Sequence, residues 1–450
     1  MNPLPVGNTA RSAPTPAPRS AGDLVSLNAL WFGLAYLWNG LHTILLPVML
    51  AGLAPGALKN TYLGALTFAG LLVAMLAQPV AGAISDRSGW LGRLGKRRPW
   101  IALGTLLDML FLGLLVFLPL SSFWLLAAAY VGLQLASSLA EAAMQSLLPD
   151  LVPAEQRGRG AGFKNAAQIA GFVAGVGLGG ALASQGKIGW ALAASGLALA
   201  FTAGWTIVGV REQPVAPKSR RTWAIGATLR TLFVDSFRLD QGAAPGYARL
   251  LAGRALLMAG YFALQGFAQF FVADELGVAN PAGITALLMA IMGAAIFLLA
   301  VPTGSLADRL GRRWLNLFAG AVGALATLSL VFVETVPQLV VVGGLVGASI
   351  GVFLSVNWAW AADLVPASEA GRYLGLSNLA TAGSGAFVRL FAGPLIDSGN
   401  ALHSGLGYRA LFIVLAVGMT IGTWLLAGVP ETRSFKQEAV QIPVIEERTE

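Results

Sequence analysis

The chain has 450 residues and a formal net charge of +8, and its composition is 56% hydrophobic and 11% charged. This composition is too apolar for a soluble protein of this length and is typical of a protein that spans a lipid bilayer. Because the chain contains no cysteine, disulfides and thiolate metal sites are excluded.

Stretches of roughly 20 apolar residues recur along the chain, and each is long enough to cross about 30 Å of hydrocarbon. The first twenty residues are rich in Pro, Ala and Ser and lack an apolar segment. They therefore predict a disordered tail, not a cleaved signal peptide. We expect twelve membrane-spanning helices, at residues 25–50, 60–84, 99–119, 122–148, 160–184, 188–209, 249–273, 281–306, 313–333, 337–362, 373–396 and 406–428.

A long polar interval at residues 211–248 divides the expected spans into two sets of six. In this central segment, apolar residues such as Leu229 and Phe233 recur at helical spacing amid arginines. Two structures fit that pattern, an amphipathic helix on the cytoplasmic leaflet or a flexible linker. The expected fold is an all-α membrane protein with a tail at 1–24, a six-helix bundle at 25–210, the central segment, a second six-helix bundle at 249–430 and a tail at 431–450.

Basic residues are unevenly distributed among the expected loops. The loops near residues 87–98, 157–164 and 309–313 and the central segment are rich in Lys and Arg, whereas the intervening loops carry few charges. By the positive-inside rule, the basic loops and both termini are expected in the cytoplasm of a cell whose plasma or inner membrane holds the chain. The positive charge therefore indicates topology, and no nucleic-acid partner is expected.

One sequence motif, called the phrase below, occurs twice in the chain. Gly82-Ala-Ile-Ser-Asp86-Arg87 returns 222 residues later as Gly304-Ser-Leu-Ala-Asp308-Arg309, and Asp150-Leu-Val-Pro153 returns as Asp363-Leu-Val-Pro366. The repeats keep their order and nearly the same spacing, so the two bundles are expected to be pseudo-symmetric copies of one unit. In a membrane protein, such a duplication builds two bundles with a binding site between them.

Both copies of the phrase combine acids with clustered basic residues. We expect these charges to form ion pairs that hold the two bundles together on the cytoplasmic side and that break when this side opens. The alternative is that the charges are solvated and only fix topology, since an exposed pair contributes about 0–1 kcal/mol. Because the set occurs twice in register, we favour a cytoplasmic gate made of Gly82, Asp86, Arg87, Arg97, Arg98, Asp150, Glu155, Arg159, Gly304, Asp308, Arg309, Arg312, Arg313, Asp363, Glu369 and Arg372.

These motifs resemble the signature of the major facilitator superfamily over roughly residues 25–430. Within that superfamily, Ser85-Asp-Arg87 followed by Gly95-Lys-Arg-Arg-Pro99-Trp100-Ile101 resembles the branch of sucrose–proton and glycoside–cation symporters. Members of that branch typically carry an arginine triplet, where this chain has Lys96 in the first position. The resemblance implies a two-bundle fold that transports a solute by alternating access.

Polar side chains recur inside the expected spans, where a buried charge costs about 2.5 kcal/mol or more. Several follow helical stripes, such as Gln134, Ser138, Glu141 and Gln145. Such stripes are tolerated when they face a shared water-filled cavity. The alternative is that isolated amides only bond neighbouring helices, at about 0.6 kcal/mol each.

A carboxylate that alternates between desolvated surroundings and a nearby cation can load and release a proton. On this basis the proton-coupling candidates are Asp108, Glu141, Arg389 and His42, although His42 is equally suited to packing. Aromatic faces and amides suit a sugar ring with its apolar face and hydroxyl rim. The substrate-binding candidates are Asn39, Gln134, Gln145, Gln168, Tyr261, Gln265, Gln269, Asn357, Trp358 and Asn378.

The sequence therefore predicts a monomeric secondary transporter that moves a small solute, a sugar or glycoside, together with a proton or, alternatively, sodium. Two other functions stay open, a drug or metabolite exporter of the same fold and an assembly factor that does not transport. An enzyme is not expected, because no nucleophile–base or metal-ligand spacing occurs. No cofactor is expected either, since a phosphate-loop-like pattern that ends at Lys96 is followed by Arg97 instead of Ser or Thr.

Overall fold

The computed structural model describes residues 18–87, 95–117, 122–212, 244–365 and 370–431. Several expectations fall outside the described residues: most of the two tails, most of the amphipathic segment expected at 211–248, the gate residue Glu369, and the side chains of the gate residues Asp86, Arg87, Asp308 and Arg372. The tail expected at 1–24 was predicted too long, because the first helix begins at Ala21.

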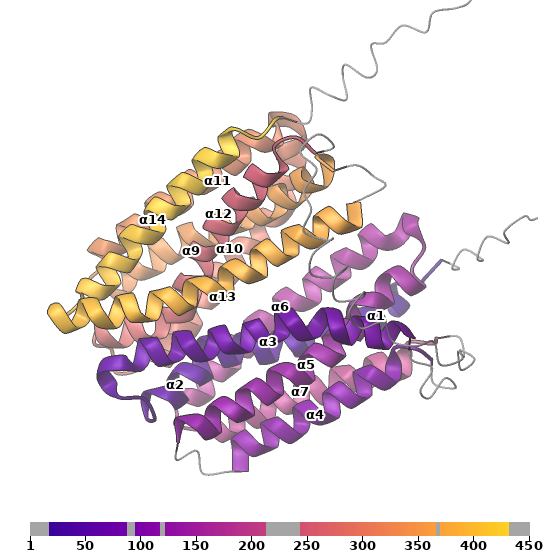
Figure 1. The fold of residues 1–450 in the computed structure, drawn as a ribbon, viewed down its shortest axis with the longest axis horizontal. Helices are drawn as coiled ribbons and strands as arrows, with labels where there is room; N and C mark the ends of the chain where they lie inside the picture. The colour runs from indigo at the N-terminus through magenta and orange to yellow at the C-terminus, as the bar shows by residue number, and fades with distance from the viewer. Residues whose placement is uncertain (1–17, 88–94, 118–121, 213–243, 366–369, 432–450) are drawn as a thin grey trace, which may run out of the picture.

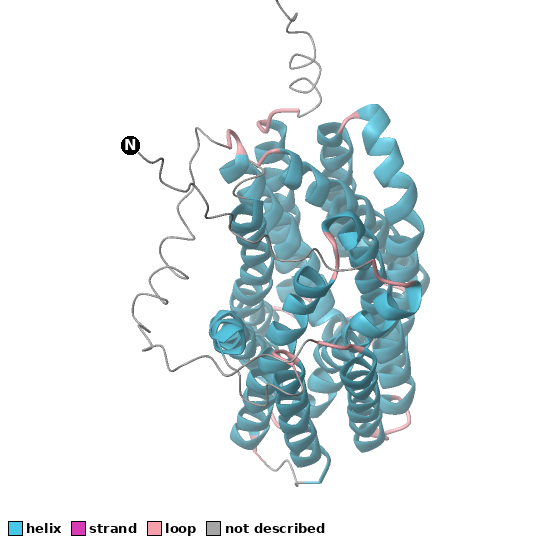
Figure 2. Cartoon of the chain, turned by 90° about the vertical axis from the view of Figure 1, so that its right-hand side faces the viewer, coloured by secondary structure: helices cyan, strands magenta, loops and turns pink. Residues whose placement is uncertain are grey.

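Within the described residues, twelve helices are long and apolar enough to cross a membrane, so the predicted all-α fold with twelve spans is confirmed (Figure 2). The first span consists of α1 (Ala21–Gly40), the π-helix η1 (Leu41–Leu45) and α2 (Leu46–Ala51). The other eleven are α3 (Lys59–Arg87), α4 (Arg98–Phe117), α5 (Phe123–Leu151), α6 (Arg157–Ala183), α7 (Ile188–Gly209), α9 (Tyr247–Asp274), α10 (Pro281–Leu310), α11 (Arg312–Ser329), α12 (Val336–Asp363), α13 (Ala370–Leu402) and α14 (Leu406–Ala427).

Several helices are longer than the apolar stretches that predicted them. The helix α13 has 33 residues, which corresponds to about 50 Å at 1.5 Å per residue, against about 30 Å of hydrocarbon. Its ends therefore reach beyond the apolar layer, where polar residues continue the helix. Local sequence fixes some helix starts, since Ser20 caps α1 in a capping box with Asp23 and Thr335 pairs with Gln338 at the start of α12.

The helices form two halves that lie side by side (Figure 1). One half contains α1 to α7, and the other contains α9 to α14. Across the boundary, α3 packs against α13 and α6 packs against α10. The repeat in the sequence thus corresponds to two six-helix units that face each other.

Glycines allow two of these helix pairs to approach closely. A Cβ atom at Gly393 of α13 would collide with the backbone carbonyl of Asn60 at the start of α3, and one at Gly180 of α6 would collide with Ala286 of α10. Small residues are common where transmembrane helices pack backbone against backbone. Both contacts lie at the end of the molecule opposite the loops of residues 95–98 and 311–313, which we call the basic end.

At this opposite end, a carboxylate of one half binds the first turn of a helix in the other half. Asp397 of α13 accepts hydrogen bonds from Asn60 Nδ2 at 2.8 Å, from the Thr61 backbone N–H at 2.7 Å and from Thr61 Oγ1 at 2.6 Å. The first backbone N–H groups of a helix lack partners within the helix and carry positive partial charge. Asp397 therefore acts as a cap for α3 that is supplied by the other half.

Two further contacts surround this cap. Lys59 Nζ lies 2.5 Å from Asp274 Oδ1 at the end of α9, and the hydroxyl of Tyr408 donates to Asp274 Oδ2 at 2.7 Å. Asp397 is 7% exposed, so the cap is shielded from water, whereas the Lys59–Asp274 pair is partly exposed. We refer to Lys59, Asn60, Thr61, Asp274, Asp397 and Tyr408 as the opposite-end seal.

Removing the cap is expected to loosen the seal. We predict that Asp397→Ala weakens the first turn of α3 by about 1 kcal/mol, the typical contribution of a helix cap. Hydrogen-exchange mass spectrometry of peptides covering residues 56–66 is then expected to show faster exchange in the variant. Asp150→Ala, which removes a carboxylate at the basic end, is the matched control. Equal exchange in Asp397→Ala and the native chain would contradict the cap.

The seal is also expected to respond to pH through Glu275, the residue after α9. Burial raises the pKa of this carboxyl above its ordinary 4.5, the neighbouring Asp274 charge raises it further, and Arg409 opposes both effects. Because the ionised form is disfavoured, the folded state gains stability as pH falls through the raised pKa and loses it as pH rises.

Glu275→Gln, which stays neutral, is therefore expected to melt at a higher temperature than the native chain at about pH 7. The difference is expected to shrink toward about pH 4, near the ordinary pKa of glutamic acid. Thermal unfolding followed at several pH values tests this expectation. A difference that is independent of pH would exclude Glu275 as the titrating group.

Candidate functional site

A cavity of about 630 Å³ lies between the two halves. Its lining comes from the first span, α3, α5 and α6 on one side and from α9, α10, α12 and α13 on the other. Eight of the predicted coupling and binding residues line it: Asn39, His42, Gln134, Glu141, Gln168, Tyr261, Gln265 and Arg389. These eight polar and aromatic residues thus meet in one internal space, as the free-energy cost of polar groups in hydrocarbon requires.

Glu141 is the carboxylate of this cavity. It is held between two glutamines, since Gln78 Nε2 of α3 donates to Glu141 Oε2 at 2.9 Å and Gln145 Nε2 donates to Glu141 Oε1 at 3.2 Å. Lys164 of α6, which is outside the cavity lining, places its Nζ 3.9 Å from the ring centroid of Trp31, which belongs to the lining. The wall therefore combines an acid with an indole, and a cation packs against that indole.

Aromatic rings form a second part of the same wall. The centroids of Trp38 and His42 are 5.1 Å apart, and His42 Nε2 lies 2.8 Å from the hydroxyl of Tyr130. Each ring packs edge-on or tilted against its neighbours, which fixes the orientation of the indole and imidazole. Trp31 and Trp38 thus present rigid apolar faces beside the amides of Asn39 and Gln134.

The two halves also touch within the cavity, at the π-helix η1. Gln265 Nε2 of α9 lies 3.3 Å from both Asn39 Oδ1 and Thr43 Oγ1. One turn later, Gln269 donates its amide to the backbone carbonyls of Thr43 and Ile44 at 3.1 and 3.2 Å. A π-helix turn interrupts the regular α-helical bonding and is often found at functional sites. Here it supplies acceptors to the opposite half.

Arg389 of α13 projects a buried cation into the cavity. It is 5% exposed, and its guanidinium lies 5.8 Å from the ring centroid of Phe262. Among the residues that the structure describes, Arg389 makes no ion pair, and its Nε has no hydrogen-bond partner. Gly266 leaves room for this side chain, because a Cβ there would approach Arg389 Nε to 2.9 Å. An unpaired guanidinium of this kind is available to bind a solute.

The opposite wall of the cavity is largely apolar. It includes three methionines of the second half, Met258, Met289 and Met292, together with Ile296, Ile350 and Leu354. Methionine side chains are flexible and polarizable, so they adapt to ligands of different shape. The cavity therefore has one wall rich in amides and indoles and one wall that is apolar and adaptable.

Several of the predicted residues lie outside the cavity lining. Asp108 of α4 is fully buried and accepts a hydrogen bond from Ser137 of α5 at 2.8 Å, outside the cavity lining. Asn357 accepts a bond from Arg254 Nη1 at 2.6 Å, and Trp358 is 38% exposed. Gln145, Gln269 and Asn378 are also absent from the cavity lining.

Some polar residues at the site were not predicted: Gln78 and Thr381 line the cavity, and Tyr130 contacts His42. Gln78 bonds Glu141, and Tyr130 bonds His42. Gln78 was visible as an amide inside an expected span, immediately before Pro79. The role of Tyr130 depends on the packing of α5 against the first span, which no sequence pattern indicated.

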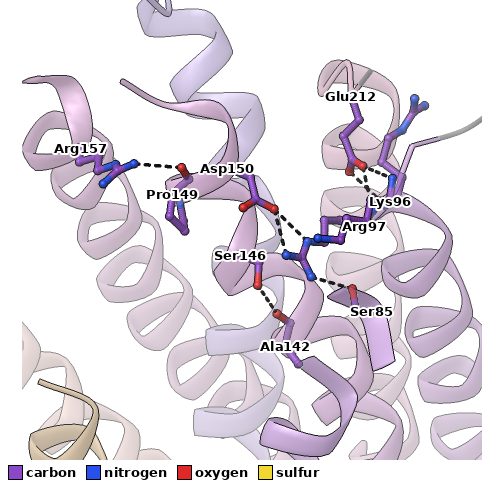
Figure 3. A network of polar contacts seen from close by, with 10 residues as sticks. Ser85, Lys96, Arg97, Ala142, Ser146, Pro149, Asp150, Arg157 and Glu212 are labelled. Carbon is purple, nitrogen blue, oxygen red and sulfur yellow. Dashed lines mark hydrogen bonds and ion pairs between the residues drawn. The ribbon is translucent and has the colours of Figure 1, made fainter. Parts of the chain in front are cut away.

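At the basic end, the predicted gate residues Arg97 and Asp150 belong to a network of polar contacts (Figure 3). Arg97, whose side chain is 4% exposed, donates from Nε to Asp150 Oδ2 at 3.0 Å and from Nη1 to Ser85 Oγ at 3.0 Å. Glu212, after α7, accepts hydrogen bonds from the backbone N–H groups of three consecutive residues: Lys96, Arg97 and Arg98.

The second half repeats this arrangement. Arg312 Nη1 lies 2.8 Å from Asp363 Oδ2, and Glu431 accepts from the backbone N–H groups of Arg312 and Arg313 at 3.2 and 3.0 Å. These ion pairs join elements of the same half. The sequence analysis expected ion pairs between the two halves, and that expectation stays a prediction. The gate residues Glu155, Arg159 and Arg309 are exposed, and Gly82 and Gly304 have open space or distant neighbours at their Cβ positions.

Comparisons with known proteins place the chain among transporters. It is 26% identical over 411 residues, 87% of this chain and 89% of the relative, to multidrug resistance protein MdtG of Enterobacter lignolyticus (strain SCF1). It is 36% identical over 132 residues to multidrug transporter QDR2 of Candida glabrata (strain ATCC 2001), a match that spans only 21% of that relative and 29% of this chain.

Its fold is similar to the crystal structure of a D-xylose–proton symporter, with a TM-score of 0.67, 17% identity, and coverage of 92% of this chain and 97% of the other. The family model described as MFS/sugar transport protein matches residues 32–373. The chain therefore belongs to the MFS/sugar transport protein family and is a multi-pass membrane transporter.

Proposed function

We propose that this transporter carries one sugar or glycoside together with a proton, by alternating access to the central cavity. The observation that carries the proposal is the composition of that cavity. Its volume of about 630 Å³ falls within the range of small-molecule sites, about 300–1,000 Å³. Trp31 and Trp38 offer apolar faces to a sugar ring, while the amides around them offer hydrogen bonds to its hydroxyls.

In this proposal the unpaired guanidinium of Arg389 donates to solute hydroxyls, and the apolar wall accepts the aglycone of a glycoside. Glu141 carries the proton, because it is the carboxylate of the lining and both of its oxygens are hydrogen-bonded by amides. Asp108 is not part of this proposal, since it lies outside the lining. By the positive-inside rule the basic end faces the cytoplasm, and one chain with one cavity suffices for transport.

A second candidate function is export of apolar compounds. The methionines of the apolar wall and the similarity to a multidrug resistance protein favour it. The two functions differ in what stabilises the purified protein. A bound ligand raises the melting temperature of the protein, and more so at higher occupancy. Melting temperatures measured with a panel of sugars, glycosides and apolar cations therefore separate the two functions. Stabilisation by apolar cations alone would favour the exporter.

Proton coupling is expected to depend on Glu141. We predict that Glu141→Gln in proteoliposomes loses accumulation of labelled sugar driven by an inward proton gradient but retains exchange of sugar at equal concentrations. The neutral side chain cannot carry the proton, yet the cavity keeps its shape. Asp108→Asn is the matched control, because it neutralises a buried acid outside the cavity, and it is expected to accumulate sugar like the native chain. Full accumulation by Glu141→Gln would reject this role.

Sugar binding is expected to depend on the indole of Trp38. Loss of an aromatic contact costs about 0.5–1.5 kcal/mol, so Trp38→Ala is expected to raise KM for uptake by about two- to tenfold. Trp358→Ala, which removes an indole outside the cavity, is expected to leave KM unchanged. Initial uptake rates over a range of sugar concentrations measure both. An unchanged KM in Trp38→Ala would remove this indole from the site.

A further inference from the structure

A second hollow, of about 460 Å³, lies on the outside of the first half, between α1, α6 and α7. We call it the side groove. Phe201 and Trp205 of α7 are 67% and 45% exposed, so this face is turned toward the bilayer. The groove is almost wholly apolar, and its lining includes Asn28 of α1 and Phe163, Ala166, Ala167 and Ala170 of α6.

One lining residue carries an unused hydrogen-bond acceptor. Asn28 is 2% exposed, and its Nδ2 donates to the backbone carbonyls of Leu24 at 2.8 Å and Gly160 at 3.3 Å. Its Oδ1 has no partner among the described residues. A buried amide oxygen without a donor costs free energy. A ligand in the side groove with an O–H or N–H group would remove this cost.

A cation lies at the same level. Arg159 of α6 is exposed and forms no hydrogen bond or ion pair with the part of the chain that the structure describes. Phe163, Ala166 and Ala170 line the groove. Arg159 precedes them by 4, 7 and 11 residues, which is the spacing of residues on one face of a helix. Because Asn28 bonds the carbonyl of the next residue, Gly160, the Asn28 amide and the backbone of Arg159 lie at the same level along α6.

We propose that the side groove binds one anionic glycerophospholipid whose headgroup carries a free hydroxyl. Its phosphate pairs with Arg159, the headgroup hydroxyl donates to Asn28 Oδ1, and an acyl chain lies along the alanines and aromatic rings of α6 and α7. Arginine binds phosphate through charge-assisted, often bidentate hydrogen bonds. The apolar lining favours an acyl chain over a free phosphate ester, which has no apolar part to bury there.

The proposal is tested with the full-length chain in detergent micelles, using three lipids with identical acyl chains. Phosphatidylglycerol has the charge and the hydroxyl, phosphatidylmethanol has the charge alone, and phosphatidylcholine has neither a net charge nor a donor. Competition against a spin-labelled phosphatidylglycerol gives relative affinities. The expected order is phosphatidylglycerol, then phosphatidylmethanol, then phosphatidylcholine, with about a fivefold advantage for the charge.

Variants locate the binding. Arg159→Gln is expected to abolish the advantage of the two anionic lipids, whereas Arg157→Gln, which changes an arginine off the lining face, is expected to keep it. Ala167→Phe fills the groove and is expected to weaken binding of all three lipids, and Ala167→Leu provides a milder filling if the first variant is unstable. Soluble glycerophosphoglycerol, which lacks acyl chains, is expected not to compete.

Three outcomes would overturn the proposal. The first is equal affinity for phosphatidylglycerol and phosphatidylcholine, and the second is an anionic preference that survives Arg159→Gln. The third is unchanged lipid binding by a correctly folded Ala167→Phe variant, which would mean that another segment or ligand occupies the groove. Retention of a single melting transition identifies correct folding in each variant.

Discussion

A charged or amide side chain inside hydrocarbon costs free energy unless it meets another polar group or water. This constraint determines where the present chain places its acids, amides and arginines. Glu141, Gln265 and Arg389 come from three helices of two halves, and all of them line one cavity between those halves. The helix surfaces turned outward carry large exposed apolar side chains such as Leu106, Phe201 and Phe318. Fold and site therefore follow from the same requirement.

The two ends of the molecule differ in whether their polar contacts join the two halves. At the opposite end, Asp397 caps a helix of the other half, and Gly393 lets the two backbones meet. At the basic end, the ion pairs of Arg97 and Arg312 stay within their own halves. Glycines there, such as Gly162 and Gly375, have open space at their Cβ positions. Two halves that are fastened at one end are suited to a rocking motion about the site.

Much of this arrangement was predictable from the sequence. Span lengths, the polar interval at 211–248 and the repeated phrase at Gly82 and Gly304 predicted twelve helices in two units, because hydropathy and repetition are local properties. The stripe on α5 predicted that Gln134 and Glu141 face a cavity. Asp108 could not be assigned in this way, because a lone acid on α4 gives no periodicity, and only the packing of α4 against Ser137 places it outside the lining.

Contacts between distant segments could not be predicted from the sequence either, because they depend on how the helices pack. The cap that Asp397 provides for α3 joins residues more than 330 positions apart, and neither segment carries a motif for it. The π-helix η1 and its bonds to Gln265 and Gln269 likewise depend on how α9 approaches the first span. Conversely, the pairs of Arg97 and Arg312 form within halves, because their acids, Asp150 and Asp363, lie in the last turns of α5 and α12 of the same unit.

The central claim is that the two halves move about the cavity so that each end opens in turn. Because the native chain lacks cysteine, spin labels can be attached uniquely at Leu58 and His403 for the opposite end, and at Gly162 and Gly375 for the basic end. Pulsed electron spin resonance of both pairs, with and without a transported solute, measures the motion. The account predicts that the opposite-end distance lengthens as the basic-end distance shortens. Distances that stay fixed, or that change in the same direction, would contradict it.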